Sequence, residues 1–213
     1  MSFTVNNSAA NTTTGGTSVS VSISIPTGHS VGVIARSTNA GTLSVTGNNA
    51  YTIGNTVIGS FSDQLKSFYS LGIGSSETAI VLNSTASEFL SFVVWDITAT
   101  GTIAYADSEG QCYVFNNPST TDGVTTGSMT LTSADGLLIS AGWDPGGGTL
   151  TIGTGFTADA TALAMVSEHK AVTASAAATW TDNTANSRPV VMGLAFQVSG
   201  GGGGNTASIA WIT

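Results

Sequence analysis

One pentapeptide has the residue types and spacing of a serine nucleophile. Residues 28–32, Gly-His-Ser-Val-Gly, match the nucleophile-elbow pattern, in which a serine on a sharp strand-to-helix turn attacks an acyl carbon. The context does not fit this chemistry, because the residues after Ser30 continue as a strand pattern and His169 is the only other histidine. In a chain with 27 glycines such a match arises from composition alone. We therefore expect no catalytic residues and no enzyme.

Metal-ligating and cofactor-binding patterns are equally sparse. Glu168–Lys170 ends a strand pattern, and we interpret it as a polar cluster because two histidines in the whole chain give little basis for a zinc site. The lone Cys112 predicts a buried, inert thiol. Asp107, Glu109 and Asp144 offer carboxylate oxygens of the kind that calcium takes, but without EF-hand spacing, so a calcium ion is left open. Glycine motifs for nucleotides are absent. We predict no cofactor and no metal.

Trp143 and Asp144 form the best candidate for a ligand platform. An indole presents a large apolar face with a polar edge, and it stacks well on a sugar ring where it is exposed. Trp143 stands at the mouth of the loop Asp-Pro-Gly-Gly-Gly, residues 144–148, which also supplies a carboxylate. Burial of Trp143 in the core or against another subunit is the alternative. If the platform exists, its ligand is a glycan.

Charged side chains are scarce. Four Lys and Arg residues face twelve Asp and Glu residues, giving a net charge of −8 and 8% charged residues, against about 25% in an average soluble protein. The hydrophobic content of 41% argues against disorder. The acidic balance, without any basic cluster, excludes nucleic acid and anionic membrane surfaces as partners. So little charge predicts that much of the exterior contacts other copies or a coat protein.

The beginning of the chain predicts no secretory signal peptide, because residues 1–7 contain no basic residue and no apolar run. The single cysteine excludes an intrachain disulfide. The Ser-, Thr- and Gly-rich composition nevertheless suits a protein that faces the outside. A virion-surface component made in the host cytoplasm and released by lysis reconciles the two observations, and a cytosolic assembly protein is the alternative.

Apolar residues recur with a period of two, which is typical of strands with one buried face. Val19–Ile25 alternates with serines, a Pro-Thr-Gly turn follows, and Val31–Ala35 begins the next run. Residues 62–71 fit a strand and a two-turn helix equally well. Other short runs, punctuated by Gly, Asn, Asp or Pro, cover residues 42–46, 51–53, 78–82, 89–97, 102–106, 111–115, 128–132, 137–143, 149–152, 163–169, 176–181 and 190–198. Many short strands predict an antiparallel sandwich or barrel.

Two short segments resemble each other. Residues 41–47 read Gly-Thr-Leu-Ser-Val-Thr-Gly and residues 148–153 read Gly-Thr-Leu-Thr-Ile-Gly. A duplicated half-sandwich would explain the likeness, and so would the general bias toward Gly and Thr. We divide the chain into an N-terminal arm (residues 1–16), a sandwich domain (17–199), and a Gly-rich linker with a docking strand (200–213).

The C-terminal segment is the predicted partner-binding element. Five glycines, Gly200 to Gly204, form a flexible linker that spans roughly 12 Å, and an uncharged, β-prone stretch follows. Ile209, Trp211 and Ile212 would be sticky if left in water. The segment either folds back as an edge strand of its own domain or adds a strand to a neighbouring subunit.

From about Ser18 to Val198, the order of motifs resembles the jelly-roll β-sandwich modules of phage and bacterial virion structural proteins. The matching motifs are Ile-Ser-Ile-Pro-Thr-Gly (23–28), Phe-Val-Val-Trp-Asp-Ile (92–97), Gly-Leu-Leu-Ile (136–139), Gly-Gly-Gly (146–148), Gly-Thr-Gly-Phe-Thr (153–157), Val-Ser-Glu-His-Lys (166–170), Trp180 and Val190–Phe196. The resemblance implies an all-β, antiparallel jelly-roll sandwich with a C-terminal extension. It also implies a trimeric virion protein, either a capsid decoration (cement) or head-fibre subunit that binds coat protein, or a tail-associated subunit. A surface module that binds carbohydrate or a receptor is the alternative.

Overall fold

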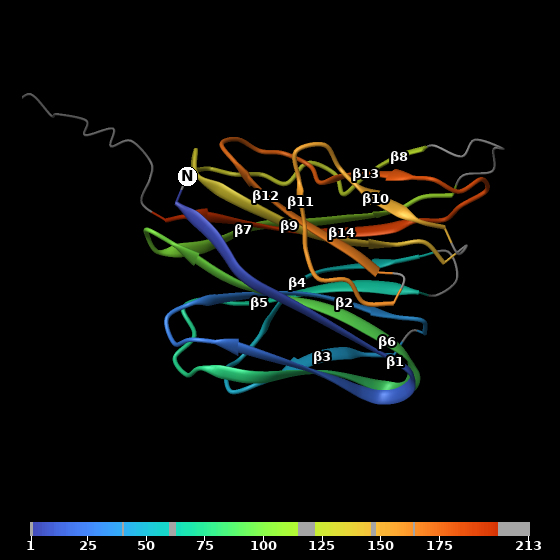
Figure 1. Ribbon diagram of the computed structural model, residues 1–213, viewed down its shortest axis with the longest axis horizontal. Helices are drawn as coiled ribbons and strands as arrows, with labels where there is room; N and C mark the ends of the chain where they lie inside the picture. Colours follow the sequence, from blue (N-terminus) through green and yellow to red (C-terminus); the bar gives the residue numbers. More distant parts are fainter. Residues whose placement is uncertain are drawn as a thin grey trace, which may run out of the picture.

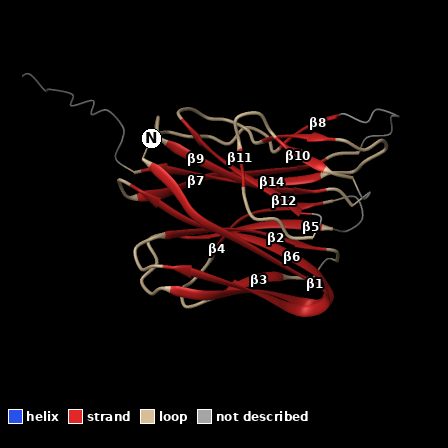
Figure 2. Cartoon of the chain, viewed as in Figure 1, coloured by secondary structure: helices blue, strands red, loops and turns tan. Residues whose placement is uncertain are grey.

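The computed structural model describes residues 2–39, 41–59, 63–114, 122–145, 148–163 and 165–199. Within these ranges the regular elements are all β-strands, and every strand pairing is antiparallel (Figure 2). The expected all-β, antiparallel sandwich is therefore confirmed. No helix among these residues is long and apolar enough to cross a membrane.

The chain divides into two halves of similar length. The N-terminal half contains β1 (Phe3–Ile25), β2 (Ser30–Ser37), β3 (Leu43–Thr46), β4 (Thr52–Ile58), β5 (Gln64–Ser70) and β6 (Glu77–Ala99). The C-terminal half contains β7 (Ile103–Cys112), β8 (Asp122–Thr125), β9 (Gly136–Trp143), β10 (Leu150–Ile152), β11 (Thr157–Ala158), β12 (Met165–Val172), β13 (Thr179–Asp182) and β14 (Val190–Val198). Figure 1 shows the N-terminal half, blue to green, below the C-terminal half, which runs to red.

Both halves have the same strand order. In the N-terminal half the order is β1-β6-β2-β5-β4, with β3 also paired to β6. In the C-terminal half it is β7-β14-β9-β12-β11, with β8, β13 and β10 forming a separate three-stranded sheet. Each strand thus has a counterpart: β2 matches β9, β3 matches β10, β4 matches β11 and β5 matches β12. The long strand β1 matches β7 plus β8, and β6 matches β14 plus β13. Because β3 and β10 lie in the two similar Gly-Thr-Leu segments, the topology supports duplication over compositional bias.

Apolar side chains fill three successive layers. One cluster lies inside the N-terminal half, where Val19, Val21 and Ile23 on β1 are buried and the intervening serines are exposed. A second cluster lies between the halves and joins β2, β5 and β6 to β9, β12 and β14. Two smaller clusters cover the outer face of the sheet that contains β9 and β14. The large sheets of the two halves therefore pack face to face, and a further layer backs each of them.

Several boundaries differ from the sequence expectations. Residues 3–16, expected as an arm, form the first part of β1 and pair with β6. The runs 78–82 and 89–97 belong to the one strand β6, and the run 102–106 falls largely within β7, which ends at Cys112 and so includes only the first two residues of the run 111–115. Residues 64–70 are strand β5, so the strand alternative holds over the helix. The predicted linker and docking strand, residues 200–213, lie outside the described residues.

Candidate functional site

The register of the two halves assigns counterparts to individual residues. The shared Gly-Thr-Leu segments align Leu43 with Leu150, and the same spacing aligns Arg36 on β2 with Trp143 on β9. Arg36 pairs across the ladder with Leu65 on β5, and Trp143 pairs with Met165 on β12. Following β5 and β12 onward from these pairs makes Tyr69 the counterpart of His169. Comparing counterpart residues distinguishes side chains that both halves need for the shared fold from side chains that only one half contains.

The predicted platform of Trp143 and Asp144 is closed, which corrects that expectation. Trp143 is 7% exposed, and the Arg36 guanidinium lies 3.1 Å from the centroid of its ring. Asp144 is buried and accepts hydrogen bonds from the backbone N–H of Gly148 at 2.8 Å and of Arg188 at 3.0 Å. The burial alternative therefore holds, because the counterpart residue from the other half covers the indole that a sugar would need.

Electrostatics at this end of the molecule also indicate a structural role. Arg36 is buried, and its guanidinium also lies 4.7 Å from the Phe89 ring centroid. Burial lowers the pKa of Arg36 to about 10, although the nearby Asp63 carboxylate opposes this change. Burial likewise raises the pKa of Asp63 to about 6, and Arg36 opposes that shift. Arg36 and Asp63 thus stabilise each other's charge where the two halves meet.

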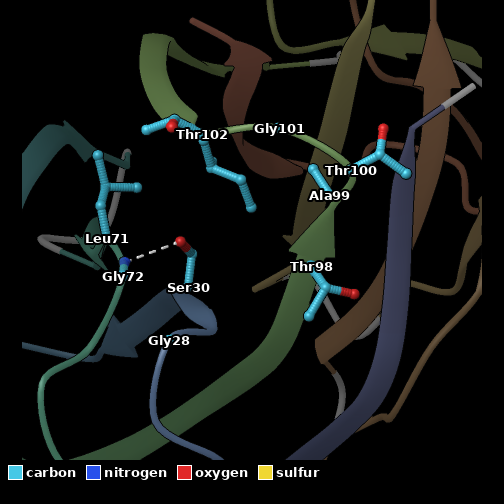
Figure 3. A pocket seen from close by; sticks show the side chains of 10 residues that line it. Gly28, Ser30, Leu71, Gly72, Thr98, Ala99, Thr100, Gly101 and Thr102 are labelled. Carbon is cyan, nitrogen blue, oxygen red and sulfur yellow. Dashed lines mark hydrogen bonds between the residues drawn. The ribbon is translucent and has the colours of Figure 1, made fainter.

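Ser30, the candidate of the nucleophile pattern, serves the backbone instead. It is buried on β2, which continues as a strand as expected, and its Oγ accepts a hydrogen bond from the Gly72 N–H at 3.1 Å (Figure 3). An open cleft of about 530 Å³ beside it is lined by small residues, including Gly28 and residues 98–103. His29 forms a contact of 2.7 Å between its Nδ1 and Asp96. Within the described ranges, no hydrogen bond joins Ser30 to a histidine.

Most buried carboxylates tie down turns. Glu77 accepts hydrogen bonds from the backbone N–H groups of Asn48 at 2.8 Å and Asn49 at 3.0 Å, just after β3. Glu168 accepts one from the Gly153 N–H at 2.9 Å, just after the counterpart strand β10, and one from Ser140 at 3.0 Å. Burial raises the pKa of Glu168 to about 7. In the part of the chain that the structure describes, no three His, Cys, Asp or Glu residues are arranged to hold a metal ion.

The most specific polar arrangement joins Trp95, Asp159 and His169. The indole Nε1 of Trp95 on β6 donates to Asp159 at 2.7 Å, and His169 Nδ1 on β12 lies 2.8 and 2.9 Å from the two Asp159 oxygens. A carboxylate only accepts, so Nδ1 carries a proton and the Nε2 of a neutral ring is left with its lone pair. The cluster connects the two halves, because Trp95 belongs to the N-terminal half, whereas Asp159 and His169 belong to the C-terminal half.

An open cleft of about 510 Å³ lies beside this cluster, and we call it the His169 cleft. It lies where the start of β1 passes the β12 side of the other half (Figure 1). Its lining residues are Phe3, Thr4, Val5, Leu137, Gly155, Thr157, His169, Lys170 and Ala171. The sequence located His169 only as part of a strand-end cluster. It gave no signal for Asp159 or Trp95, because they lie far apart along the chain.

The counterpart region of the N-terminal half is filled by aromatic rings. Tyr69, the counterpart of His169, stacks on Tyr105 with ring centroids 4.4 Å apart and an interplanar angle of 4°. Gly54 stands where Asp159 stands in the other half, and a Cβ built there would lie 3.1 Å from Leu194, the counterpart of Trp95. The shared fold therefore forms without a histidine, an aspartate or a tryptophan at these positions.

Comparison with known proteins adds no family. No family model matches the chain, and no curated protein matches it significantly. Among solved structures, AerE from Microcystis aeruginosa is similar over 86% of this chain and 84% of its own, with 8% sequence identity and a TM-score of 0.29. A likeness of that size carries no argument about function.

Proposed function

We propose that the chain is a non-enzymatic structural subunit of a virion surface, a capsid decoration (cement) or head-fibre protein that binds neighbouring coat-protein subunits. A tail-associated subunit is the closest alternative. One observation carries the proposal. All four Lys and Arg residues and all twelve Asp and Glu residues lie among the described residues, and eight of these sixteen are buried while the other eight are only partly exposed.

An exterior with so little exposed charge fits permanent contact better than free solution. Soluble domains usually keep interspersed charges on the surface, and net charge opposes association. Here several carboxylates are instead directed inward, onto turns and histidines. A surface of hydroxyl, amide and glycine groups can enter a large interface without burying unpaired ions. Exposed apolar side chains, Ile53 and Ile58 on the edge strand β4 and Leu163 before β12, add contact area.

The assembly device in this proposal is the C-terminal segment. The linker Gly200 to Gly204 lets Ile209, Trp211 and Ile212 reach a neighbouring subunit and pair there as an added strand. The assembly is a homo-oligomer, with a trimer as the working model. We also propose that each half is one jelly roll, since its first strand pairs with its last, as in a double Greek key.

Light scattering on the full chain and on a chain ending at Ser199 tests the proposal. We expect the full chain to be oligomeric and the truncated chain to dissociate, because the added strand is removed. Trp211→Ala should weaken assembly, whereas Thr206→Ala in the same segment should not. A full chain that is strictly monomeric and does not associate with coat protein would overturn the proposal. Unchanged assembly after truncation would overturn the role of the segment.

A further inference from the structure

The lining of the His169 cleft contains an imidazole and an ammonium group, which is unusual for this chain. The molecule has four Lys and Arg residues and two histidines, yet His169 and Lys170 both line this one cleft. None of the described residues that line it is acidic, because Asp159 lies behind the imidazole. Lys170 is therefore the group in this lining that can pair with a negatively charged ligand group.

The imidazole is held in a fixed orientation. Both Asp159 oxygens lie within hydrogen-bond distance of Nδ1, and the Trp95 indole fixes Asp159 in turn. His169 remains partly exposed, with 22% of its side chain accessible. A positioned Nε2 acceptor loses little conformational freedom when it accepts a hydrogen bond from a ligand hydroxyl.

The remaining walls supply two further kinds of contact. The Thr4 and Thr157 residues, both exposed, line the cleft with hydroxyl groups, and the partly buried Phe3 and Val5 provide an apolar surface. The Lys170 Nζ lies 5.0 Å from the centroid of the Phe156 ring, and its charge acts on the Glu168 carboxylate without a direct ion pair among the described residues. The lining is divided about evenly between polar and apolar surface. Such a mixture suits a sugar, which carries several hydroxyl groups around a ring with an apolar face.

The other half shows that packing alone does not require this cluster. At the counterpart position Tyr69 and Tyr105 close the space by stacking, and Gly54 replaces the buried carboxylate. Burying a carboxylate such as Asp159 is unfavourable unless it is well paired. Two equivalent positions in the fold thus hold different side chains. The position with the oriented imidazole, His169, is also the one with an open cleft beside it.

We propose that the His169 cleft binds a carboxylate-bearing sugar, such as a hexuronic or sialic acid residue of a glycan. Lys170 pairs with the carboxylate, the Nε2 of His169 accepts a hydrogen bond from a ring hydroxyl, and Thr4 and Thr157 contact other hydroxyls. The apolar face of the sugar packs on Phe3 and Val5. This site is independent of the C-terminal segment and of the assembly proposed above.

Titration of the full chain with glucuronic acid and N-acetylneuraminic acid, followed by NMR or calorimetry, tests the proposal. We expect saturable binding, with shifted resonances confined to residues 3–5, 155–157 and 169–170. His169→Gln should weaken binding at least about tenfold, since a hydrogen bond to a partly buried, oriented group is lost. His169→Tyr, which introduces the residue found at the counterpart position Tyr69, should weaken it to a similar extent. His29→Gln is the matched control, because His29 has the same Nδ1–carboxylate contact outside the cleft, and it should bind normally.

Three comparison ligands make the outcome decisive. Glucose should bind at least about tenfold more weakly, because it lacks the group that Lys170 would pair with. Acetate and inorganic phosphate should also bind more weakly, since they lack the ring. Equal binding of glucose would overturn the anionic character, and equal binding of acetate or phosphate would overturn the sugar. Absence of binding by both acidic sugars, or shifts outside the cleft, would overturn the site. Thermal unfolding of each variant, and the wild-type shift map, separate these outcomes from misfolding.

Discussion

The two halves of the molecule share a strand order and differ in what fills it. Their large sheets run β1-β6-β2-β5-β4 and β7-β14-β9-β12-β11, so the backbone frame is common to both. Ser67 and its counterpart Ser167 both bond to the backbone beside the edge strand of each half: Ser67 accepts from the Asn55 N–H at 2.8 Å, and Ser167 donates to the Ala160 carbonyl at 2.5 Å. Hydroxyl contacts with the backbone are therefore retained, whereas the larger side chains diverge.

Where counterpart residues meet, the divergence becomes an interaction. Arg36 and Trp143 occupy equivalent positions on β2 and β9, and they stack on each other at 3.1 Å. Contact between a residue and its own counterpart is expected where two halves are related by a two-fold rotation, near its axis, and the Arg36–Trp143 contact fits that arrangement. In a symmetric dimer both positions would hold the same residue. Covalent linkage of the halves permits a cation on one side and an indole on the other.

The most direct test of the difference between the halves is to place a residue from one half at the counterpart position of the other. Gly54→Asp puts the carboxylate of the C-terminal half into the N-terminal half. A Cβ there would lie 2.7 Å from Ser67 Oγ and 3.1 Å from Leu194, and no indole or imidazole awaits the charge. We expect unfolding in urea to show a loss of about 3–4 kcal/mol, from overpacking and an unpaired, half-buried carboxylate.

Gly74→Asp is the matched control in the same half. No atom lies within 4 Å of a Cβ built at Gly74, and the residue is exposed. Its free energy of unfolding should change by no more than about 0.5 kcal/mol. If Gly54→Asp had an equally small effect, the regions beside β4 and β11 would tolerate the same residues. The contrast between the filled Tyr69 region and the His169 cleft would then not indicate a function.

A second test uses the carboxylate that anchors β10. Burial raises the pKa of Glu168 to about 7 in the folded chain from an ordinary value of 4.5. The folded state then binds more protons than the unfolded state between these values, so stability should fall as the pH rises through that window. Between these pH values, the free energy of unfolding of Glu168→Gln should fall by roughly 2–3 kcal/mol less than that of the wild type. The variant should therefore be more stable than the wild type at pH 8.

Urea unfolding of both proteins at pH 4.5 and pH 8 provides the measurement. Asp63, whose pKa burial raises to about 6, contributes to both proteins in the same direction, so the difference between them isolates Glu168. Parallel pH profiles for the two proteins would contradict the assignment. The counterpart strand β3 is anchored by Glu77, which offers a comparison for the same substitution.

Local patterning was sufficient to predict most strands but not their continuity. The alternation in Val19–Ile25 and the apolar run of β14 depend on neighbouring residues, and both were found from sequence. The polar stretch 83–88 hid the continuity of β6, because its hydrogen bonds with β1 and β3 do not depend on apolar side chains. Residues 3–16 lacked a clear period for the same reason.

The sites were harder to predict, because each depends on contacts between the halves. Trp143 looked like an exposed platform since nothing near it in sequence indicates that Arg36 covers it. Asp159 lies in an Ala-rich stretch without any motif, and its partners Trp95 and His169 come from different sheets. The duplication was the signal that could have helped. Aligning the two halves shows His169 in place of Tyr69 before any distance is known.

The smallest expected effect concerns the two counterpart serines, Ser67 and Ser167. Ser67→Ala removes the acceptor of the Asn55 N–H, whereas Ser167→Ala removes a donor to the Ala160 carbonyl. An unsatisfied N–H is less easily accommodated than a carbonyl with one partner fewer. We therefore expect losses of about 1–2 kcal/mol for Ser67→Ala and about 0.5–1 kcal/mol for Ser167→Ala in urea unfolding. The double variant should be additive within about 0.5 kcal/mol, because the two sites share no partner. A reversed ranking would mean that the two edges are held by different contacts, and that the equivalence of β4 and β11 ends at the backbone.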